Sequence, residues 1–68
     1  MSIEITVNGQ RREFESESTI SQLLGQLNLD SRAIAVEVNQ ILVPRDQHQQ
    51  TRIVSGDVLE IVTLVGGG

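Results

Sequence analysis

The sequence predicts a domain of the α+β class, in which a mixed, mostly antiparallel sheet of four or five strands is covered on one face by one helix. Residues 3–7 alternate apolar and polar side chains, which is the period of a half-buried strand. Residues 20–27 place apolar side chains at helical spacing, and strand-like apolar runs return at 33–43 and 58–65. Two strands, one helix and three further strands, in this order, make an α+β layout.

Length and composition restrict what this domain can do. Its 68 residues make one small domain, without cysteine and with a single histidine, so we expect no disulfide and no metal site. Nine acidic residues against five arginines give a net charge of −4, which argues against a nucleic-acid partner and suits a partner with a basic docking surface. No signal sequence or apolar run of membrane length is present, so we expect a cytoplasmic protein that is monomeric when alone.

The first two strands are expected to form a hairpin. Ile3, Ile5 and Val7 define the buried side of the first strand, and Asn8-Gly9 is a strong signal for a type I′ turn. The return strand, residues 10–15, is polar except for Phe14, which we place in the core. A polar return strand is typical of the edge of a sheet.

The helix carries its own start and stop signals. Thr19 and Gln22 fit a capping box, in which each residue satisfies a backbone amide of the other. The apolar stripe that should pack on the sheet consists of Ile20, Leu23, Leu24 and Leu27. Asn28 is expected to end the helix in a left-handed conformation, with Leu29 packing back on the stripe.

Residues 33–38 and 41–43 are expected to form the third and fourth strands, joined by a turn at Asn39-Gln40. Pro44 ends the fourth strand, because proline has no amide to donate to a sheet. Residues 45–52 read as a polar surface loop in which His48 is exposed to solvent. A tight turn at 55–57 then leads into the last strand.

The last strand is apolar on both faces. Because Glu60 should be solvated, we expect its face of the strand to be the outer one, and this face also carries Val58, Val62 and Leu64. An exposed apolar patch of this kind tends to mark a binding site, so these three residues are our candidates for a partner interface. The interpretation fails if Glu60 points inward. A last strand in the centre of the sheet, parallel to the first, completes a β-grasp, or ubiquitin-like, fold.

The chain ends in Gly66-Gly67-Gly68, and we expect a β-grasp domain over residues 1–65 followed by a flexible glycine tail over 66–68. Without Cβ atoms, Gly66 and Gly67 can pass through a channel too narrow for side chains and present the α-carboxylate of Gly68. That carboxylate is ionised at neutral pH and must be activated, for example as an acyl-adenylate, before it reacts. The chain has no phosphate-binding loop, so a partner must bring ATP and magnesium. Sulfide delivered to the activated carbonyl would leave a thiocarboxylate.

These features resemble the ThiS family, the ubiquitin-like sulfur carrier proteins of thiamine biosynthesis. The resemblance rests on Val38-Asn39-Gln40-Ile41-Leu42-Val43-Pro44-Arg45, on Ser55-Gly56-Asp57 and on the terminal Gly67-Gly68. It implies a protein co-substrate rather than an enzyme. Gly68 would be adenylated by a ThiF-like adenylyltransferase related to ubiquitin-activating enzymes, receive sulfur from a sulfur-delivery protein and donate it to a ThiG-like thiazole synthase. The resemblance also implies an apolar partner surface at Val62 and Leu64.

Three other functions stay open at the level of sequence. The small subunit of molybdopterin synthase shares the Gly-Asp turn and the terminal Gly-Gly, but typically has a proline-rich approach to its tail, and residues 60–65 contain no proline. A ubiquitin-like protein modifier would instead join its tail to lysines of target proteins. A plain β-grasp interaction domain would have a tail without chemical function.

Overall fold

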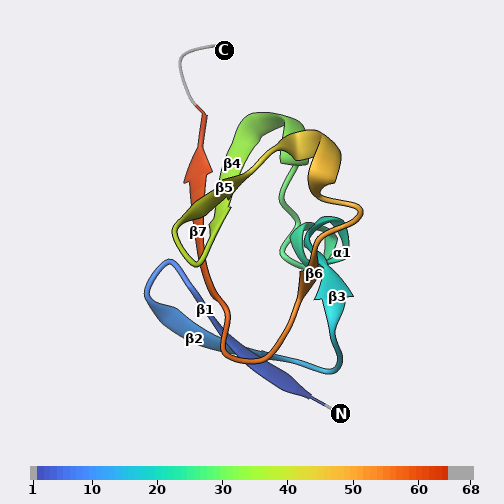
Figure 1. Ribbon diagram of the computed structural model, residues 1–68, viewed down its shortest axis with the longest axis vertical. Helices are drawn as coiled ribbons and strands as arrows, with labels where there is room; N and C mark the ends of the chain where they lie inside the picture. The colour runs from blue at the N-terminus through green and yellow to red at the C-terminus, as the bar shows by residue number, and fades with distance from the viewer. Residues whose placement is uncertain (1, 65–68) are drawn as a thin grey trace.

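The computed structural model describes residues 2–64, in which one helix covers one face of a five-stranded sheet (Figure 1). The strands of this sheet are β1 (Ile3–Val7), β2 (Gln10–Phe14), β4 (Ile34–Val38), β5 (Ile41–Val43) and β7 (Val58–Thr63), in the order β2-β1-β7-β4-β5. The helix is α1 (Ile20–Gln26), and beside it lies a small second sheet of β3 (Ser18–Thr19) and β6 (Arg52–Ile53). Two short 3-10 turns, η1 (Ser31–Ala33) and η2 (Arg45–Gln47), precede β4 and follow β5. No helix in this part of the chain is long and apolar enough to cross a membrane.

β7 occupies the centre of the five-stranded sheet and lies between β1 and β4. It runs parallel to β1, with Thr6 opposite Val58, and antiparallel to β4, with Ile34 opposite Thr63. The remaining pairs in this sheet, β1 with β2 and β4 with β5, are antiparallel. The predicted mixed sheet and ubiquitin-like β-grasp topology are therefore confirmed.

The two predicted hairpin turns form with the backbone conformation that their residues favour. Asn8 and Gly9 have φ values of 51° and 82°, and Asn39 and Gln40 have values of 53° and 71°. Positive φ at both central residues is the signature of the type I′ turn, which matches the twist of the flanking strands. β2, which the first turn produces, lies at one edge of the sheet and exposes nearly all its side chains, as predicted.

The helix begins at the predicted capping box. The Gln22 amide donates to Thr19 Oγ1 at 3.2 Å, while the Thr19 amide donates to Gln22 Oε1 at 3.0 Å. Past its end, Asn28 has a φ of 60°, the expected left-handed conformation. The Leu29 amide donates to the Leu24 carbonyl at 2.9 Å, which folds the chain back on the helix as predicted, but the Leu29 side chain keeps 38% of its surface exposed.

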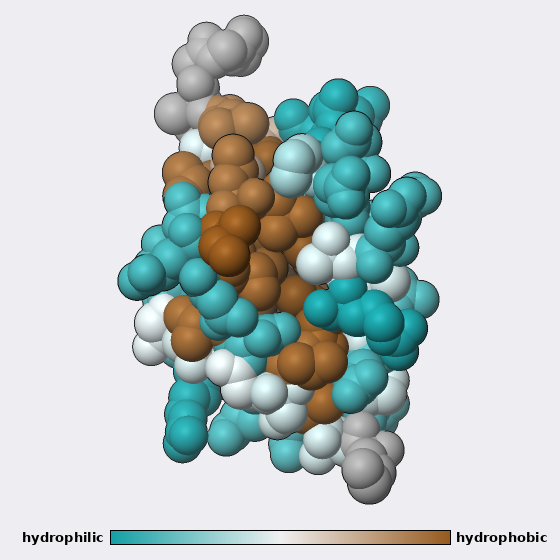
Figure 2. Space-filling view, in the orientation of Figure 1, coloured by the Kyte–Doolittle hydropathy of each residue, from teal (hydrophilic) through white to brown (hydrophobic). Residues whose placement is uncertain are grey.

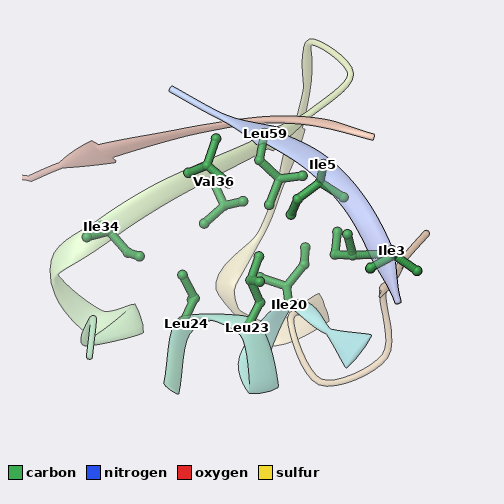
Figure 3. Close-up of a cluster of buried hydrophobic side chains, with 10 residues drawn as sticks. Ile3, Ile5, Ile20, Leu23, Leu24, Ile34, Val36 and Leu59 are labelled. Carbon is green, nitrogen blue, oxygen red and sulfur yellow. The ribbon is translucent and has the colours of Figure 1, made fainter. Parts of the chain in front are cut away.

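The core lies between α1 and the inner face of the sheet (Figure 3). Its buried side chains come from all layers of the fold and are Ile3, Ile5, Val7, Ile20, Leu23, Leu24, Ile34, Val36, Ile53 and Leu59. Phe14 and Leu27 are half-buried and pack against this cluster, which broadly confirms the predicted apolar faces. Leu59 of β7 is part of this cluster, so the face of β7 that carries Leu59 points toward α1 and the opposite face points outward.

The segment between β5 and β7 differs from the prediction. His48 was expected in solvent, but it is buried, with 2% of its surface exposed. Its ring Nε2 donates to the Val43 carbonyl at 3.1 Å, and its own carbonyl accepts from the Ser21 amide at 3.0 Å. The reason is that the first amides of α1 need acceptors, and this segment folds over the helix N-terminus to supply them. The prediction also missed Ile53, which this path carries into the core.

Element boundaries differ slightly from those expected. Ala33 belongs to η1 rather than to the third strand, and β7 ends at Thr63. The predicted glycine tail at 66–68 lies outside the described residues, so the boundary between domain and tail stays a prediction.

Candidate functional site

The candidate site is the outer face of β7, the strand that leads to the C-terminal glycines. Val58, Val62 and Leu64 keep 45%, 58% and 56% of their surface exposed, and Glu60 is exposed between them. Leu59, on the opposite face, is fully buried. The predicted orientation of the strand is therefore correct, and the three apolar residues are available for contact. Gly66, Gly67 and Gly68, the predicted reactive end, lie outside the described residues.

Strand β5 enlarges the exposed apolar surface, a contribution that we did not predict. Leu42, which is 60% exposed, lies opposite Glu37 and so shares the outer face with Glu60, whereas Ile41, which is 69% exposed, lies on the other face at the edge of the sheet. Figure 2 shows apolar side chains gathered in a band over β7 and β5, with hydrophilic side chains on either side. Three consecutive apolar residues on a short edge strand were the available signal, because alternation turns at least one of them away from the core.

The middle of the outer face is acidic. Glu37 on β4 lies directly opposite Glu60 on β7, and residues opposite each other in a sheet share a face. Neither carboxylate has a basic side chain within 4.0 Å among residues 2–64. Like charges in this arrangement oppose folding slightly, so the pair is better suited to a basic group from outside than to the stability of the domain.

Two asparagines fix the position of β7 from opposite sides. Asn8, in the first hairpin turn, accepts from the Ile61 amide through Oδ1 at 2.7 Å and donates to the Ile61 carbonyl through Nδ2 at 3.1 Å. Asn39, in the second turn, accepts from the Val58 amide at 3.0 Å and donates to Asp57 at 3.1 Å. The side-chain amides of both asparagines bond to backbone groups of β7, as a neighbouring strand would, and so hold the register of the strand that carries the candidate site.

The end of β7 is held as well. The Leu64 amide donates to the Ala33 carbonyl at 2.8 Å, which ties the last described residue to η1. The segment that follows, Val65 to Gly68, therefore starts from a fixed point at one end of the sheet. A partner that binds the outer face of β7 is placed next to that starting point.

Metal or acid–base chemistry has little support in the described part of the chain. Residues 2–64 contain no group of three or more Asp, Glu and His side chains that could hold a metal ion. The Nε2 atom of His48 is hydrogen-bonded to the Val43 carbonyl, and its Nδ1 atom is buried without a hydrogen-bond partner among residues 2–64. The outer face of β7 instead offers an exposed apolar surface next to the start of the C-terminal segment, which is suited to binding a protein partner.

Parallel first and last strands in one mixed sheet, crossed by a single helix, define the ubiquitin-like β-grasp class of proteins. A solved structure agrees with this assignment. The crystal structure of the thiamine biosynthesis protein ThiS from Geobacter metallireducens is similar with a TM-score of 0.86 and 26% sequence identity, over 97% of this chain and 100% of that chain.

The chain belongs to the ThiS family, whose family model matches residues 5–68. It is 30% identical over 66 residues to the sulfur carrier protein ThiS of Escherichia coli strain K12, which covers 97% of this chain and 100% of that protein. It is also 42% identical over 66 residues to a protein from Paramagnetospirillum magneticum named thiazole synthase. The match covers 97% of this chain, but the chain spans only 20% of the length of that relative.

Proposed function

We propose that this protein carries sulfur to the thiazole of thiamine on the α-carboxylate of Gly68. The chain itself is a co-substrate, and the chemistry takes place in partner enzymes of the cytoplasm. An adenylyltransferase of the ubiquitin-activating type binds ATP and magnesium and activates Gly68. A sulfur-delivery protein supplies the sulfur atom, and a thiazole synthase receives it.

The reaction sequence balances when the sulfur-delivery protein releases its sulfur as sulfide. The Gly68 carboxylate attacks the α-phosphorus of ATP, a new O–P bond forms, and pyrophosphate leaves. Hydrogen sulfide, in its deprotonated form, then attacks the acyl carbon of the adenylate, and AMP leaves with the oxygen through which it was attached. The product is a thiocarboxylate at Gly68, whose sulfur is the nucleophile in the next step. Glycine suits this position because a side chain would crowd the attacked carbon in a narrow active site.

One observation carries the choice of thiazole as the destination of the sulfur. A relative named thiazole synthase contains a segment that is 42% identical to almost the whole of this chain. A carrier-like segment within a polypeptide of that name supports a thiazole synthase as the partner that accepts the sulfur. Two further relatives, from Escherichia coli and Bacillus subtilis, are named sulfur carrier protein ThiS, which supports the carrier role itself.

The exposed apolar residues on the outer face of β7 support this face as the docking surface for the partner enzymes. Val58, Val62 and Leu64 are exposed on the strand that leads to Gly68, and apolar surface next to a reactive end is a suitable docking area. We propose that the adenylyltransferase and the thiazole synthase both use this face, one after the other. Glu37 and Glu60 in its centre would then meet basic side chains of these enzymes.

A reconstituted reaction tests this function. The purified chain is combined with the adenylyltransferase, ATP, magnesium, a sulfide source, the thiazole synthase and the remaining substrates of that synthase. We expect thiazole formation in proportion to the amount of carrier, and none with a variant that lacks Gly68. Formation of thiazole without the carrier, or equal formation with the shortened variant, would rule out the proposed role.

A further inference from the structure

A groove lies beside the end of β7, on the side of the β5 edge. It has a volume of about 330 Å³ and is built from η1, β4, the end of β5, η2 and Leu64. Its lining is mostly apolar, with Ala35, Leu42, Pro44 and Leu64 among the residues that contribute. We call it the exit groove, because it adjoins the point at which the chain leaves the sheet.

Two arginines, Arg32 and Arg45, contribute the charges in the lining of the exit groove. Arg32 makes a two-pronged contact with Asp30, from Nε to Oδ1 at 3.1 Å and from Nη2 to Oδ2 at 2.9 Å. Hydrogen bonds from Arg32 hold the pKa of the Asp30 carboxyl below its usual range, and the charges of Arg32 and Arg45 add smaller effects in the same direction. Asp30 is therefore ionised at neutral pH and balances the charge of Arg32.

Arg45 is left without such a partner. Within residues 2–64 no carboxylate oxygen lies within 4.0 Å of its guanidinium group. The groove thus carries one positive charge that no ion pair within residues 2–64 neutralises, in a chain whose net charge is −4. A local excess of the opposite sign, surrounded by apolar side chains, favours an anionic group attached to an apolar surface.

The position of Arg45 is fixed by the buried histidine. His48 lines the groove, and its ring holds η2 against the carbonyl at the end of β5. The His48 amide also donates to the Arg45 carbonyl at 3.1 Å. The backbone that carries Arg45 is therefore held in place before any partner arrives, which lowers the entropy lost on binding.

We propose that the exit groove receives an acidic side chain, flanked by apolar residues, from the adenylyltransferase that activates Gly68. This inference rests on the proposed function. Four residues beyond Leu64 span at most about 14 Å when fully extended, so an enzyme that holds Gly68 in its active site must lie over this end of the domain. The acidic outer face and the basic groove then provide two contacts of opposite sign, which together fix the orientation of the carrier.

Charge reversal at Arg45, compared with the same change elsewhere, tests the proposal. Arg45→Glu reverses the charge in the groove, and Arg12→Glu makes the same change in net charge on β2, at the opposite edge of the sheet. The affinity of each variant for the purified adenylyltransferase is measured by calorimetry at low and high salt. We expect Arg45→Glu to weaken binding about ten- to a hundredfold at low salt, and less as salt screens the contact. Arg12→Glu should change the affinity by no more than about twofold.

The outcomes separate the groove from the proposed function. Equal affinities for the two variants, with wild-type carrier still gaining sulfur, would overturn the role of the exit groove and leave the carrier function intact. A loss of affinity of Arg45→Glu for the thiazole synthase but not for the adenylyltransferase would also overturn it. A wild-type chain that binds the adenylyltransferase but never gains sulfur would refute the carrier function instead. We expect thermal unfolding to show that both variants are folded, because neither arginine side chain makes an ion pair in residues 2–64.

Discussion

Truncation of Leu64 to alanine should separate binding from folding. Leu64 keeps 56% of its surface exposed, so less than half of the side chain is removed from water when the domain folds. Full burial of a leucine side chain stabilises a protein by about 1.5–3 kcal/mol, so Leu64 contributes roughly 0.7–1.3 kcal/mol to the free energy of unfolding. Its exposed part is available to a partner, and loss of such an apolar anchor costs about 1–2 kcal/mol of binding energy, or roughly tenfold in affinity.

Ile20→Val is the matched control for this prediction. Ile20 is fully buried in the core, and removal of one of its methyl groups costs about 0.5–1.5 kcal/mol of stability, similar to the loss expected for Leu64→Ala. Urea unfolding gives the stability of each variant, and calorimetry gives its affinity for the adenylyltransferase. We expect similar stabilities but a weaker affinity for Leu64→Ala alone. If both variants bind as tightly as wild type, or if Leu64→Ala loses more than about 2 kcal/mol of stability, the side chain serves the fold and our interpretation of this face is wrong.

Three further substitutions test stability and are measured by urea unfolding. Gly25→Ala, within α1, should raise the free energy of unfolding by about 0.5–1 kcal/mol, because an added Cβ meets no atom within 4 Å and alanine favours the helix. Gly56→Ala has equal space but a φ of +94°, so it should be destabilising by about 1 kcal/mol or more; equal effects at both glycines would contradict this backbone argument. Glu60→Gln should raise the free energy of unfolding by about 0.2–1 kcal/mol by removing the like charge opposite Glu37, while weakening partner binding. A destabilised Glu60→Gln variant would mean that the acidic pair has an internal partner.

The parts of the fold that could be predicted from sequence depend on interactions between near neighbours. The capping box of Thr19 and Gln22 spans three residues, and each hairpin turn involves two residues with a strong backbone preference. The outward orientation of Glu60 followed from the cost of burying a charge. Alternation along β7 then placed Val58 and Val62 on the same face, so the part of the candidate site on β7 was also predictable.

The parts that were missed depend on contacts between distant segments. Nothing in the polar run of residues 45–52 indicates that it folds over α1, yet that contact buries His48 and leads Ile53 into the core. The exit groove likewise combines Arg32, Arg45 and Leu64 from three separate segments of the chain. Sequence periodicity describes single elements, and it contains no information on which loop closes over which helix end.

The central claim is that Gly68 carries sulfur, and the intact mass of the protein tests it most directly. The chain is incubated with ATP, magnesium, a sulfide source and the adenylyltransferase, and its mass is measured beside that of a variant without Gly68. The account predicts a gain equal to the replacement of one oxygen by one sulfur in the full chain, which requires ATP and does not occur in the variant. An unchanged mass, with an adenylyltransferase shown to be active on another carrier, would contradict the account.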